Sequence, residues 1–371
     1  MKKISWLCAL CITAFGTIDT LNAQEKIVIG QSAPLTGPTA DVGRDIRDGA
    51  AAIFKKANDA GGINGRKIEF VTLDDGNDRK RAGANAKTLI DEKNAIALFG
   101  FGSATLSMDA IPLTDAKGMP FVGPQTGSLA IRDKKSVFTM RASYADEIEK
   151  IISYWATYGS NKMAVVHYDD EVGKKNFETV AALVVKAKGQ QPLQISIKRN
   201  VKIEPAAFDA LFKFEPQVVV VTTQFGPVLD LFAAMQAKGK SYPVSALSFV
   251  NPDELAAAPG GVARGTTVTQ VVPSIRAGGV AIVTECSDAL KAAGFGALSY
   301  TSLESCIAAK VLVEAMKKAG KNLSRQTLYT SLENLGKVDV GGFAVTFSKD
   351  SHHGSTWTDL SILSRGGTFR H

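Results

Sequence analysis

Short β-branched runs alternate with amphipathic helical stretches along almost the whole chain, and this order constrains the fold more than any other feature. Residues 27–30 (IVIG) predict a strand, and residues 41–58, whose apolar side chains recur at helical spacing, predict the helix that follows. The block at residues 61–65 (GGING) ends that helix and turns the chain. Strands that alternate with helices favour parallel sheets with helices on both faces. The sequence therefore predicts an α/β protein.

The alternation continues for longer than one sheet of ordinary size needs. The 371 residues allow two domains, at ~100–200 residues each, and no Pro- or Ser-rich linker separates them. We therefore expect two doubly wound parallel-sheet lobes, packed closely, with the cleft between them as the natural ligand site. Further strands are predicted at 67–73, 95–99, 120–122, 163–167, 218–222 and 266–272, and further helices at 79–92, 106–116, 148–158, 177–188, 228–237, 281–292 and 303–317.

The N-terminus has the pattern of a secretory signal peptide. Lys2 and Lys3 precede an almost uncharged apolar stretch at residues 4–18, and the small residue Ala23 ends the segment. The stretch is shorter than the ~20 residues that a membrane-spanning helix needs. We predict cleavage after Ala23 and export to the periplasm. A short buried helix and a lipid-modified Cys11 are the alternatives.

Composition excludes several classes of protein. A hydrophobic fraction of 45% is too high for a disordered chain, and a mean hydropathy of +0.04 is too low for a multi-span membrane protein. The formal net charge is +7, but Lys and Arg are interspersed with Asp and Glu and form no basic run of five or more. We therefore expect no nucleic-acid partner.

Two cysteines, Cys286 and Cys306, remain after the predicted cleavage. They lie in two predicted helices that a glycine-containing loop separates, and disulfides persist in an oxidising compartment. The sequence leaves two alternatives open, a disulfide between the two residues or a pair of buried free thiols.

The chain lacks a complete catalytic or cofactor-binding motif. Gly100 and Gly102 begin a dinucleotide fingerprint, but Thr105 occupies the position of its third glycine. Lys240 resembles the lysine of a phosphate loop, but Ala234 stands where that loop requires glycine. No Gly-x-Ser-x-Gly elbow occurs. We therefore expect a protein that is not an enzyme and binds no cofactor.

Histidines and paired acids predict no metal site either. None of the four histidines belongs to a His-Glu-x-x-His motif or lies near a cysteine pair. We interpret His352 and His353 as a solvated loop pair. Asp74 and Asp75 stand where a strand ends, and we interpret them as a structural turn rather than as a metal-binding or acid–base pair.

Two strand-to-helix loops in the first half of the chain carry the candidate site. Residues 103–105 (SAT) follow one predicted strand, and residues 124–128 (PQTGS) follow the next. Their hydroxyls and free backbone N–H groups, at helix N-termini, suit an anion such as a carboxylate. Helix capping explains either loop alone without a ligand, but two such loops on adjacent strands favour a ligand site.

The block GGINGRKI at residues 61–68, followed by LDD at residues 73–75, resembles the branched-chain amino-acid binding proteins of ABC importers. Further similar segments are LTGP at 35–38, PQTG at 124–127, ALSFV at 246–250, LE at 303–304 and IAAK at 307–310. The resemblance thus spans essentially the whole mature chain. It implies a type I periplasmic binding fold, in which three crossovers join two lobes at a hinge and the ligand is held between the closing lobes. It also implies an ABC permease in the inner membrane as partner.

The resemblance further implies which first-lobe residues hold the ligand. In that family, hydroxyls and backbone N–H groups of the two first-lobe loops bind the ligand carboxylate. The corresponding residues here are Ser103, Ala104, Thr105, Gln125, Thr126 and Gly127. Ala104 replaces the Ser or Thr that is common in the family.

Second-lobe positions depart from the family pattern. The aromatic residue that closes over the ligand corresponds to Val172, and a second aromatic corresponds to Gln224, with Phe225 adjacent. The acidic residue that holds the ligand ammonium falls near Ser248, beside Phe249, and no acid stands there. Because a buried ammonium without a counter-charge costs roughly several kcal/mol, two ligand classes stay open. One is an amino acid, and the other is an aromatic or aliphatic carboxylate that lacks the amine.

Together these observations predict a monomeric periplasmic solute-binding component of an ABC importer, with a small-molecule ligand. After a signal peptide at residues 1–23, we expect residues 24–142 and 273–340 to form the first lobe, and residues 143–272 and 341–371 to form the second. The alternatives are a secreted α/β enzyme and a sensory ligand-binding domain of the same fold, since a fold alone does not settle function.

Overall fold

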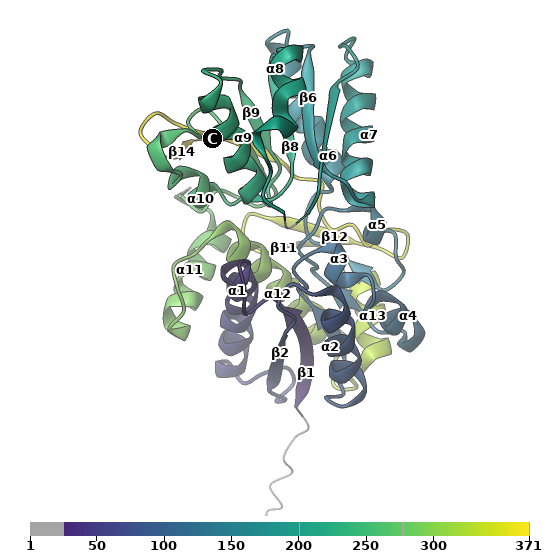
Figure 1. Cartoon of the computed structure of the whole chain (residues 1–371). Coiled ribbons are helices and arrows are strands. Elements are labelled where there is room, and N and C mark those ends of the chain that lie inside the picture. The colour runs from purple at the N-terminus through teal and green to yellow at the C-terminus, as the bar shows by residue number, and fades with distance from the viewer. Residues whose placement is uncertain (1–25, 200, 277, 371) are drawn as a thin grey trace, which may run out of the picture.

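The computed structural model describes residues 26–199, 201–276 and 278–370, except for the side chain of Asp253. This part of the chain forms two α/β lobes stacked one above the other (Figure 1). The predicted signal peptide, with Cys11 and the cleavage site after Ala23, lies outside the described residues.

The first lobe is built on a parallel sheet with the strand order β2-β1-β3-β4-β5. Alternate side chains of a strand point to opposite faces. Ile29 and Phe99 therefore enter a core covered by helices α1, α11, α12 and α13, whereas Leu98 and Phe121 enter a second core covered by α2, α3, α4 and α5. The strands are β1 (Ile27–Ala33), β2 (Ile68–Asp74), β3 (Ala97–Phe99), β4 (Phe121–Val122) and β5 (Val137–Phe138). The helices are α1 (Ala40–Asp59), α2 (Arg79–Asp91), α3 (Ala104–Ser107), α4 (Ile111–Lys117), α5 (Leu129–Arg132), α11 (Ala281–Ala293), α12 (Tyr300–Ala319) and α13 (Arg325–Glu333).

The second lobe is built on a sheet with the strand order β14-β13-β10-β9-β8-β6-β7. The five strands from β6 to β10 are parallel, but β13 and β14 add an antiparallel edge that the sequence pattern did not reveal. Helices α6 and α7 cover one face, and α8, α9 and α10 cover the other. The strands are β6 (Met163–Tyr168), β7 (Leu193–Ile197), β8 (Val218–Thr222), β9 (Val244–Ala246), β10 (Thr267–Gln270), β13 (Asp359–Leu363) and β14 (Phe369–Arg370). The helices are α6 (Tyr144–Thr157), α7 (Glu171–Lys186), α8 (Asp209–Phe214), α9 (Phe225–Ala237) and α10 (Pro252–Ala256).

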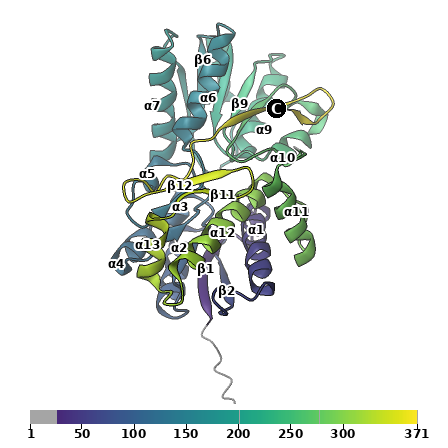
Figure 2. The ribbon, with the colours of Figure 1, turned by 180° about the vertical axis from the view of Figure 1, so that it is seen from behind.

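Three segments cross between the lobes, the number that the sequence resemblance implies. Residues 139–143 connect β5 to α6, residues 271–280 connect β10 to α11, and residues 348–358 lead to β13. Two crossovers are joined directly, because the Thr139 N–H donates to the carbonyl of His352 at 3.0 Å and the Gly354 N–H donates to the carbonyl of Thr139 at 2.8 Å. A hairpin of β11 (Gly336–Asp339) and β12 (Ala344–Phe347) lies at the level where the lobes meet (Figure 2).

This hairpin packs differently from the expected division of the chain. Val345 and Phe347 belong to the core of the first lobe, where the Phe347 ring lies 5.4 Å from the ring of Phe138. The expected boundary, which assigned residues 341–371 to the second lobe, therefore does not fit the packing of residues 341–347. Within the described part of the segment 341–371, only β13 and β14 pair with the sheet of the second lobe.

Two of the helices differ from the predicted ranges, and the local sequence explains both differences. The predicted helix at 106–116 is two helices, α3 and α4, and Pro112 lies in the first turn of α4, where its missing N–H costs nothing. Helix α6 begins at Tyr144, four residues before the predicted start. Ser143 and Asp146 form a capping box there, in which each side chain accepts a hydrogen bond from the other residue's backbone N–H.

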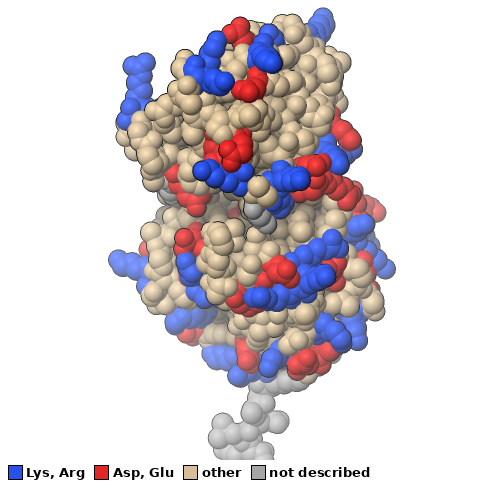
Figure 3. Space-filling view, in the orientation of Figure 1, with Lys and Arg blue, Asp and Glu red and all other residues tan. Residues whose placement is uncertain are grey.

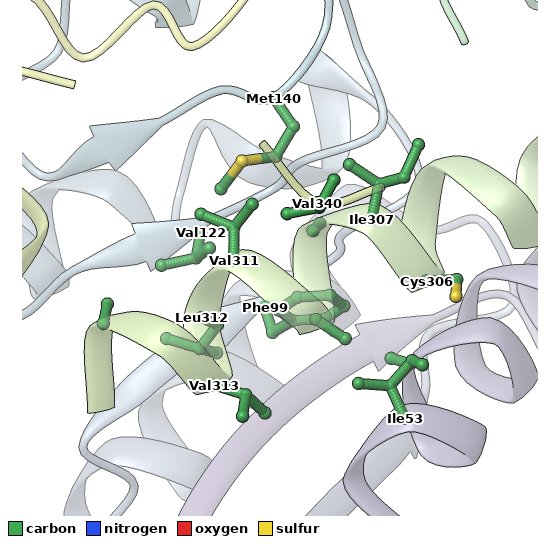
Figure 4. Packing of buried hydrophobic residues seen from close by; sticks show 14 of the residues in the cluster. Ile53, Phe99, Val122, Met140, Cys306, Ile307, Val311, Leu312, Val313 and Val340 are labelled. Atoms are coloured by element: carbon green, nitrogen blue, oxygen red, sulfur yellow. The ribbon is translucent and has the colours of Figure 1, made fainter. Parts of the chain in front are cut away.

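Helix α12 lies along the first sheet and supplies much of its core. Ile307, Val311 and Leu312 pack near Phe99 of β3, with Ile53 of α1 on the other side (Figure 4). Cys306 of this helix forms a disulfide with Cys286 of α11, with Cα atoms 6.2 Å apart. A cross-link that closes a loop of this size contributes about 3 kcal/mol.

Charged side chains of both signs are interspersed on the face of both lobes that Figure 3 shows. This agrees with the mixed charge pattern of the sequence. None of the helices in the described ranges is both long and apolar enough to span a bilayer.

Candidate functional site

Both first-lobe loops follow the carboxyl ends of parallel strands, where open α/β sheets bind ligands. The N–H of Gln125, in the loop after β4, donates to the carbonyl of Phe101, in the loop after β3, at 2.9 Å. The two loops are therefore joined. The side-chain amide nitrogen of Gln125 is buried and has no hydrogen-bond partner among the described residues. It is an unused donor at the predicted carboxylate site.

In the loop after β3, the Ser103 side chain caps the helix that follows, α3. The hydroxyl of Ser103 accepts a hydrogen bond from the N–H of Leu106 at 3.2 Å and so caps α3. Ala104 is buried in the core beside Phe101, whereas Thr105 is exposed. Capping accounts for Ser103 without a ligand.

Thr126 lies at the centre of the loop after β4, with only 1% of its surface exposed. Its hydroxyl shares a hydrogen bond with the hydroxyl of Tyr144 at 3.0 Å and accepts one from the N–H of Ser128 at 3.2 Å. The cap of α5 is Ser128, which accepts a hydrogen bond from the N–H of Ala130 at 3.3 Å. Thr126 is therefore not a helix cap, and its hydroxyl links a first-lobe loop to the first residue of α6.

Gly127 permits this close approach. A Cβ on Gly127 would lie 2.7 Å from both the backbone nitrogen and a ring carbon of Tyr144. The N–H of Tyr144 also donates to the carbonyl of Gly127 at 2.8 Å. Burial raises the pKa of Tyr144, so its hydroxyl stays neutral.

Val172 lies in the first turn of α7 and contacts both lobes. It packs against the first-lobe core that contains Phe101 and against the second-lobe core that contains Ile148. Asp170 caps the helix by accepting a hydrogen bond from the N–H of Gly173 at 2.8 Å. The position thus makes an apolar contact across the cleft.

Gln224 and Phe225 lie on the second-lobe side, where β8 leads into α9. The N–H of Gln224 donates to the hydroxyl of Tyr168 at 3.2 Å, and the Arg199 guanidinium carbon lies 3.8 Å from the centre of the Tyr168 ring. Phe225 is half-buried against the second-lobe core. Within the part of the chain that the structure describes, this pair makes no hydrogen bond or ring contact with Thr126 or Ser248.

Ser248 and Phe249 lie beside the first residues of α6. The Phe249 ring packs edge-on against Tyr144, with ring centres 5.2 Å apart. The N–H of Ser248 donates to the carboxylate of Glu147 at 2.8 Å, and its hydroxyl does so at 3.1 Å. The structure therefore brings Thr126, Tyr144, Phe249 and Ser248 into one contiguous group.

A buried charged cluster lies directly behind this group. Arg141, in the first crossover, donates to Glu147 of α6 at 2.8 Å and to Glu304 of α12 at 3.2 Å. It also contacts the Ser248 hydroxyl. Each of the three charged side chains is less than 10% exposed. One guanidinium therefore joins a first-lobe helix to a second-lobe helix.

Burial and the two carboxylates act in opposite directions on Arg141. Burial alone would lower its pKa, but Glu304 and Glu147 raise the pKa above its ordinary value. Burial raises the pKa of Glu304, and Arg141 only partly offsets this. The guanidinium thus stays charged.

A cavity of about 540 Å³ lies between α5 of the first lobe and α6 and α7 of the second. Its walls include Ser128, Tyr144 and Val172. Lys175 and Glu178 of α7 add charge. The volume lies within the range of small-molecule sites, and the cavity adjoins the loop that contains Thr126.

A family model described as "Periplasmic binding protein" matches residues 26–363. This chain belongs to the periplasmic binding protein family. The "Amino acid binding protein" of Pseudomonas aeruginosa is 26% identical over 322 residues, covering 85% of this chain and 84% of the relative. The "Leucine-, isoleucine-, valine-, threonine-, and alanine-binding protein" of the same organism is 23% identical over 378 aligned positions, covering 95% and 96%.

Solved structures share the fold. The crystal structure of a substrate-binding periplasmic protein from Ralstonia solanacearum matches with a TM-score of 0.86 at 28% identity, covering 93% of this chain and 99% of that chain. The present chain is thus a type I periplasmic binding protein, and the relatives compared here are binding proteins by name. The resemblance derived from the sequence is confirmed.

Sequence reasoning missed the buried charged cluster of this periplasmic binding protein. A signal for it was present, because Glu147 lies on the apolar stripe of its helix with Ile148 and Ile151, and Glu304 lies on the stripe that contains Ile307. Acids on an apolar stripe are rarely fully buried unless they are paired. The partner, Arg141, lies outside both helices, so periodicity alone could not identify it.

The interpretation of His352 and His353 as a solvated pair was wrong. The crossover that contains them packs across β5, so that the His352 ring stacks on Phe138 at 3.9 Å. His353 lies 3.3 Å from Asp133, and both histidines are partly buried. Burial lowers the pKa of His352.

The turn interpretation of Asp74 and Asp75 is confirmed. Asp74 accepts hydrogen bonds from the N–H groups of Leu35 and Gly76 at 2.8 and 2.9 Å. Asp75 accepts one from the hydroxyl of Ser32 at 2.8 Å. Within the described ranges, no group of His, Cys, Asp and Glu is arranged to hold a metal ion.

Proposed function

We propose that this periplasmic binding protein holds a small carboxylate-bearing ligand, either an amino acid or a carboxylate that lacks the amine, in the cleft between its lobes and delivers it to an ABC permease. The observation that carries the proposal is the cavity of about 540 Å³ between α5 and α7, which adjoins the Thr126 loop and is lined by residues of both lobes. The names of its relatives, which are amino-acid binding proteins, support the ligand class. Export by a cleaved signal peptide at residues 1–23 would place the mature protein in the periplasm. We expect it to act there as a monomer.

The first lobe supplies the polar groups for the carboxylate. The Thr126 hydroxyl and the unused amide donor of Gln125 lie in one loop, after the carboxyl end of β4. A hydrogen bond to a charged group contributes roughly 1.5–3 kcal/mol. Two such donors would be enough to orient a carboxylate, with the neighbouring N–H groups of residues 103–105 as further candidates.

The second lobe supplies apolar contacts and the motion. Val172 packs against the first-lobe core as well as its own, and Phe249 packs against Tyr144 at the start of α6. Three short crossovers form the hinge, and rotation about such segments is the usual form of domain closure around ligands. Gln224 and Phe225, which make no hydrogen bond or ring contact with Thr126 in the described structure, would join the site only when the lobes close.

The test is a ligand screen of the mature chain, beginning at residue 24, by thermal shift and calorimetric titration. The panel contains the common amino acids, their amides and their deamino carboxylates. A ligand at 100 times its dissociation constant adds about 2.7 kcal/mol of stability. We expect at least one carboxylate to bind and its amide to bind at least tenfold more weakly.

Small-angle scattering of the same protein, with and without the tightest ligand, tests closure. We expect a smaller radius of gyration at saturation. Amides that bind as tightly as the acids would contradict the carboxylate site, and identical scattering profiles would contradict the closing hinge.

A further inference from the structure

The buried cluster of Arg141, Glu147 and Glu304 contains one more acid than base. Glu147 is fully buried and accepts hydrogen bonds from Arg141, from the N–H and hydroxyl of Ser248, and from Thr269. All of its acceptor capacity is therefore in use. An uncompensated buried carboxylate is costly unless it is neutralised or paired.

Glu304 is the member of the cluster that can accept a further hydrogen bond. One of its carboxylate oxygens accepts from Arg141 at 3.2 Å, and the other has no hydrogen-bond partner among the described residues. The residue is 7% exposed, so a small part of it reaches solvent. Arg132, the other buried cation nearby, interacts with Asp146, Asp133 and Glu147. Among the described residues, Arg141 is therefore the only cation that contacts Glu304, and Glu147 shares this cation.

Neighbouring contacts place Glu304 close to the loop that contains Thr126. Glu304 precedes Ala308 by one helical turn on α12, and a Cβ on Gly123 would lie 2.8 Å from the Ala308 side chain. Gly123 begins the loop that contains Thr126. The guanidinium that binds Glu304 also lies 5.7 Å from the centre of the Tyr144 ring, and the Tyr144 hydroxyl bonds to Thr126.

We propose that Glu304 binds the amino group of the ligand, so that the ligand of this protein is an amino acid rather than a carboxylate without an amine. The inference rests on the proposed function. It assigns the counter-charge for the ammonium to a first-lobe helix, because position 248 of the second lobe is a serine whose two donors are already bonded to Glu147. An ammonium beside Glu304 brings the formal charge of the cluster and ligand amine to zero.

The experiment compares matched pairs of ligands on the mature protein and on Glu304→Gln. The pairs are leucine with 4-methylpentanoate, phenylalanine with 3-phenylpropanoate, and alanine with propanoate, which differ only in the amine. The wild type is expected to prefer the amino acid of its best pair at least tenfold. In Glu304→Gln, affinity for that amino acid is expected to fall about 10–100-fold, while affinity for the deamino partner changes less than threefold.

Two further variants separate binding from folding. Glu304→Asp keeps the charge and is expected to retain the preference for the amine. Glu285→Gln removes a partly buried acid that pairs with Lys56 and Lys310 on α1 and α12, and it is expected to leave the preference unchanged. Circular dichroism and melting temperature establish that each variant is folded.

Each outcome decides the assignment. Equal losses for both members of a pair in Glu304→Gln would make Glu304 purely structural and overturn the proposal. A wild type that binds only deamino acids would overturn it as well, yet would leave the carboxylate-binding function intact. If no member of any pair binds, the proposed function itself fails and the inference fails with it.

Discussion

The two sides of the cleft differ in how their residues are held. On the first-lobe side, Thr126 is 1% exposed and its hydroxyl is bonded on both sides. On the second-lobe side, Val172 is held by apolar contacts, and Gln224 and Phe225 are only half-buried. The first side is a preorganised set of polar groups, whereas Val172 on the second side makes apolar contacts. This difference suits a site whose first lobe captures the ligand and whose second lobe closes over it.

As the hydrogen bond between Thr126 and Tyr144 does, Arg141 ties the two lobes together. Replacing it by Met would leave Glu147 and Glu304 buried without their cation, and removal of one partner of a buried pair costs about 3–5 kcal/mol. We expect Arg141→Met to lower the free energy of unfolding by that amount in urea denaturation. Arg79→Ala is the matched control, because its pair with Asp109 is about half-exposed and such pairs contribute at most about 1 kcal/mol. Equal effects in the two variants would refute the role of Arg141 as a link between the lobes.

The polar side is tested at Thr126. Thr126→Val keeps the shape and removes the hydroxyl, so we expect a ~10–100-fold loss of ligand affinity, at ~1.4 kcal/mol per tenfold. Because the structure shows that the hydroxyl also bonds to Tyr144, we expect the unliganded protein to lose about 1 kcal/mol of stability too. Calorimetric titration beside urea denaturation measures both quantities.

Tyr144→Phe provides the control for that variant. It removes the same internal hydrogen bond and leaves the Thr126 hydroxyl in place. We expect a similar change in stability and a smaller loss of affinity. If both variants lose affinity equally, the Thr126 hydroxyl does not contact the ligand.

The apolar side is tested at Val172. Val172→Ala removes two methyl groups that pack against the cores of both lobes, and we expect losses of about 1 kcal/mol in stability and a few-fold in affinity. Val185→Ala, on the same helix but 52% exposed, is expected to change neither quantity measurably. An affinity loss as large as that of Thr126→Val would contradict the proposed difference between a polar first-lobe side and an apolar second-lobe side.

The smallest expected effect on stability is at Asp74 of the first lobe, which accepts hydrogen bonds from residues 35 and 36. Hydrogen bonding, mainly from the Thr36 hydroxyl, lowers the pKa of Asp74 from 3.8 to about 2. Since the folded-state pKa lies below the ordinary value, the ionised carboxylate stabilises the fold above about pH 4, and this contribution is lost as the pH falls towards 2. Asp74→Asn should flatten the fall of melting temperature over this range. Asp350→Asn, in an exposed turn, should leave the wild-type slope.

Much of the fold could be predicted because it depends on local pattern. The run at residues 27–30 falls within β1, and the run at residues 218–222 coincides with β8. Both could be predicted because buried parallel strands are short β-branched segments. The antiparallel edge formed by β13 and β14 was not predicted, because β14 has only two residues and β13 pairs with β10, which lies far earlier in the chain. The capping box at Ser143 could have been read from the sequence and would have placed the start of α6 correctly.

The candidate site divides in the same way. The loops at residues 103–105 and 124–128 could be located because each follows a strand and precedes a helix, which are neighbours in sequence. The identity of the groups that meet there could not. Thr126 meets Tyr144 across 18 residues, and Arg141 meets Glu304 across 163.

The sequence by itself thus determined the α/β class, the two-lobed arrangement and the loops at the strand ends, because these follow from side-chain periodicity and turn chemistry over a few residues. Only the tertiary structure decided that the β11–β12 hairpin belongs to the first core, that His352 is stacked on Phe138, and that a guanidinium in a crossover joins Glu147 to Glu304. Such contacts bring together residues far apart in the chain. Their energies depend on burial and on the choice of partner, and neither quantity is fixed until the lobes have packed.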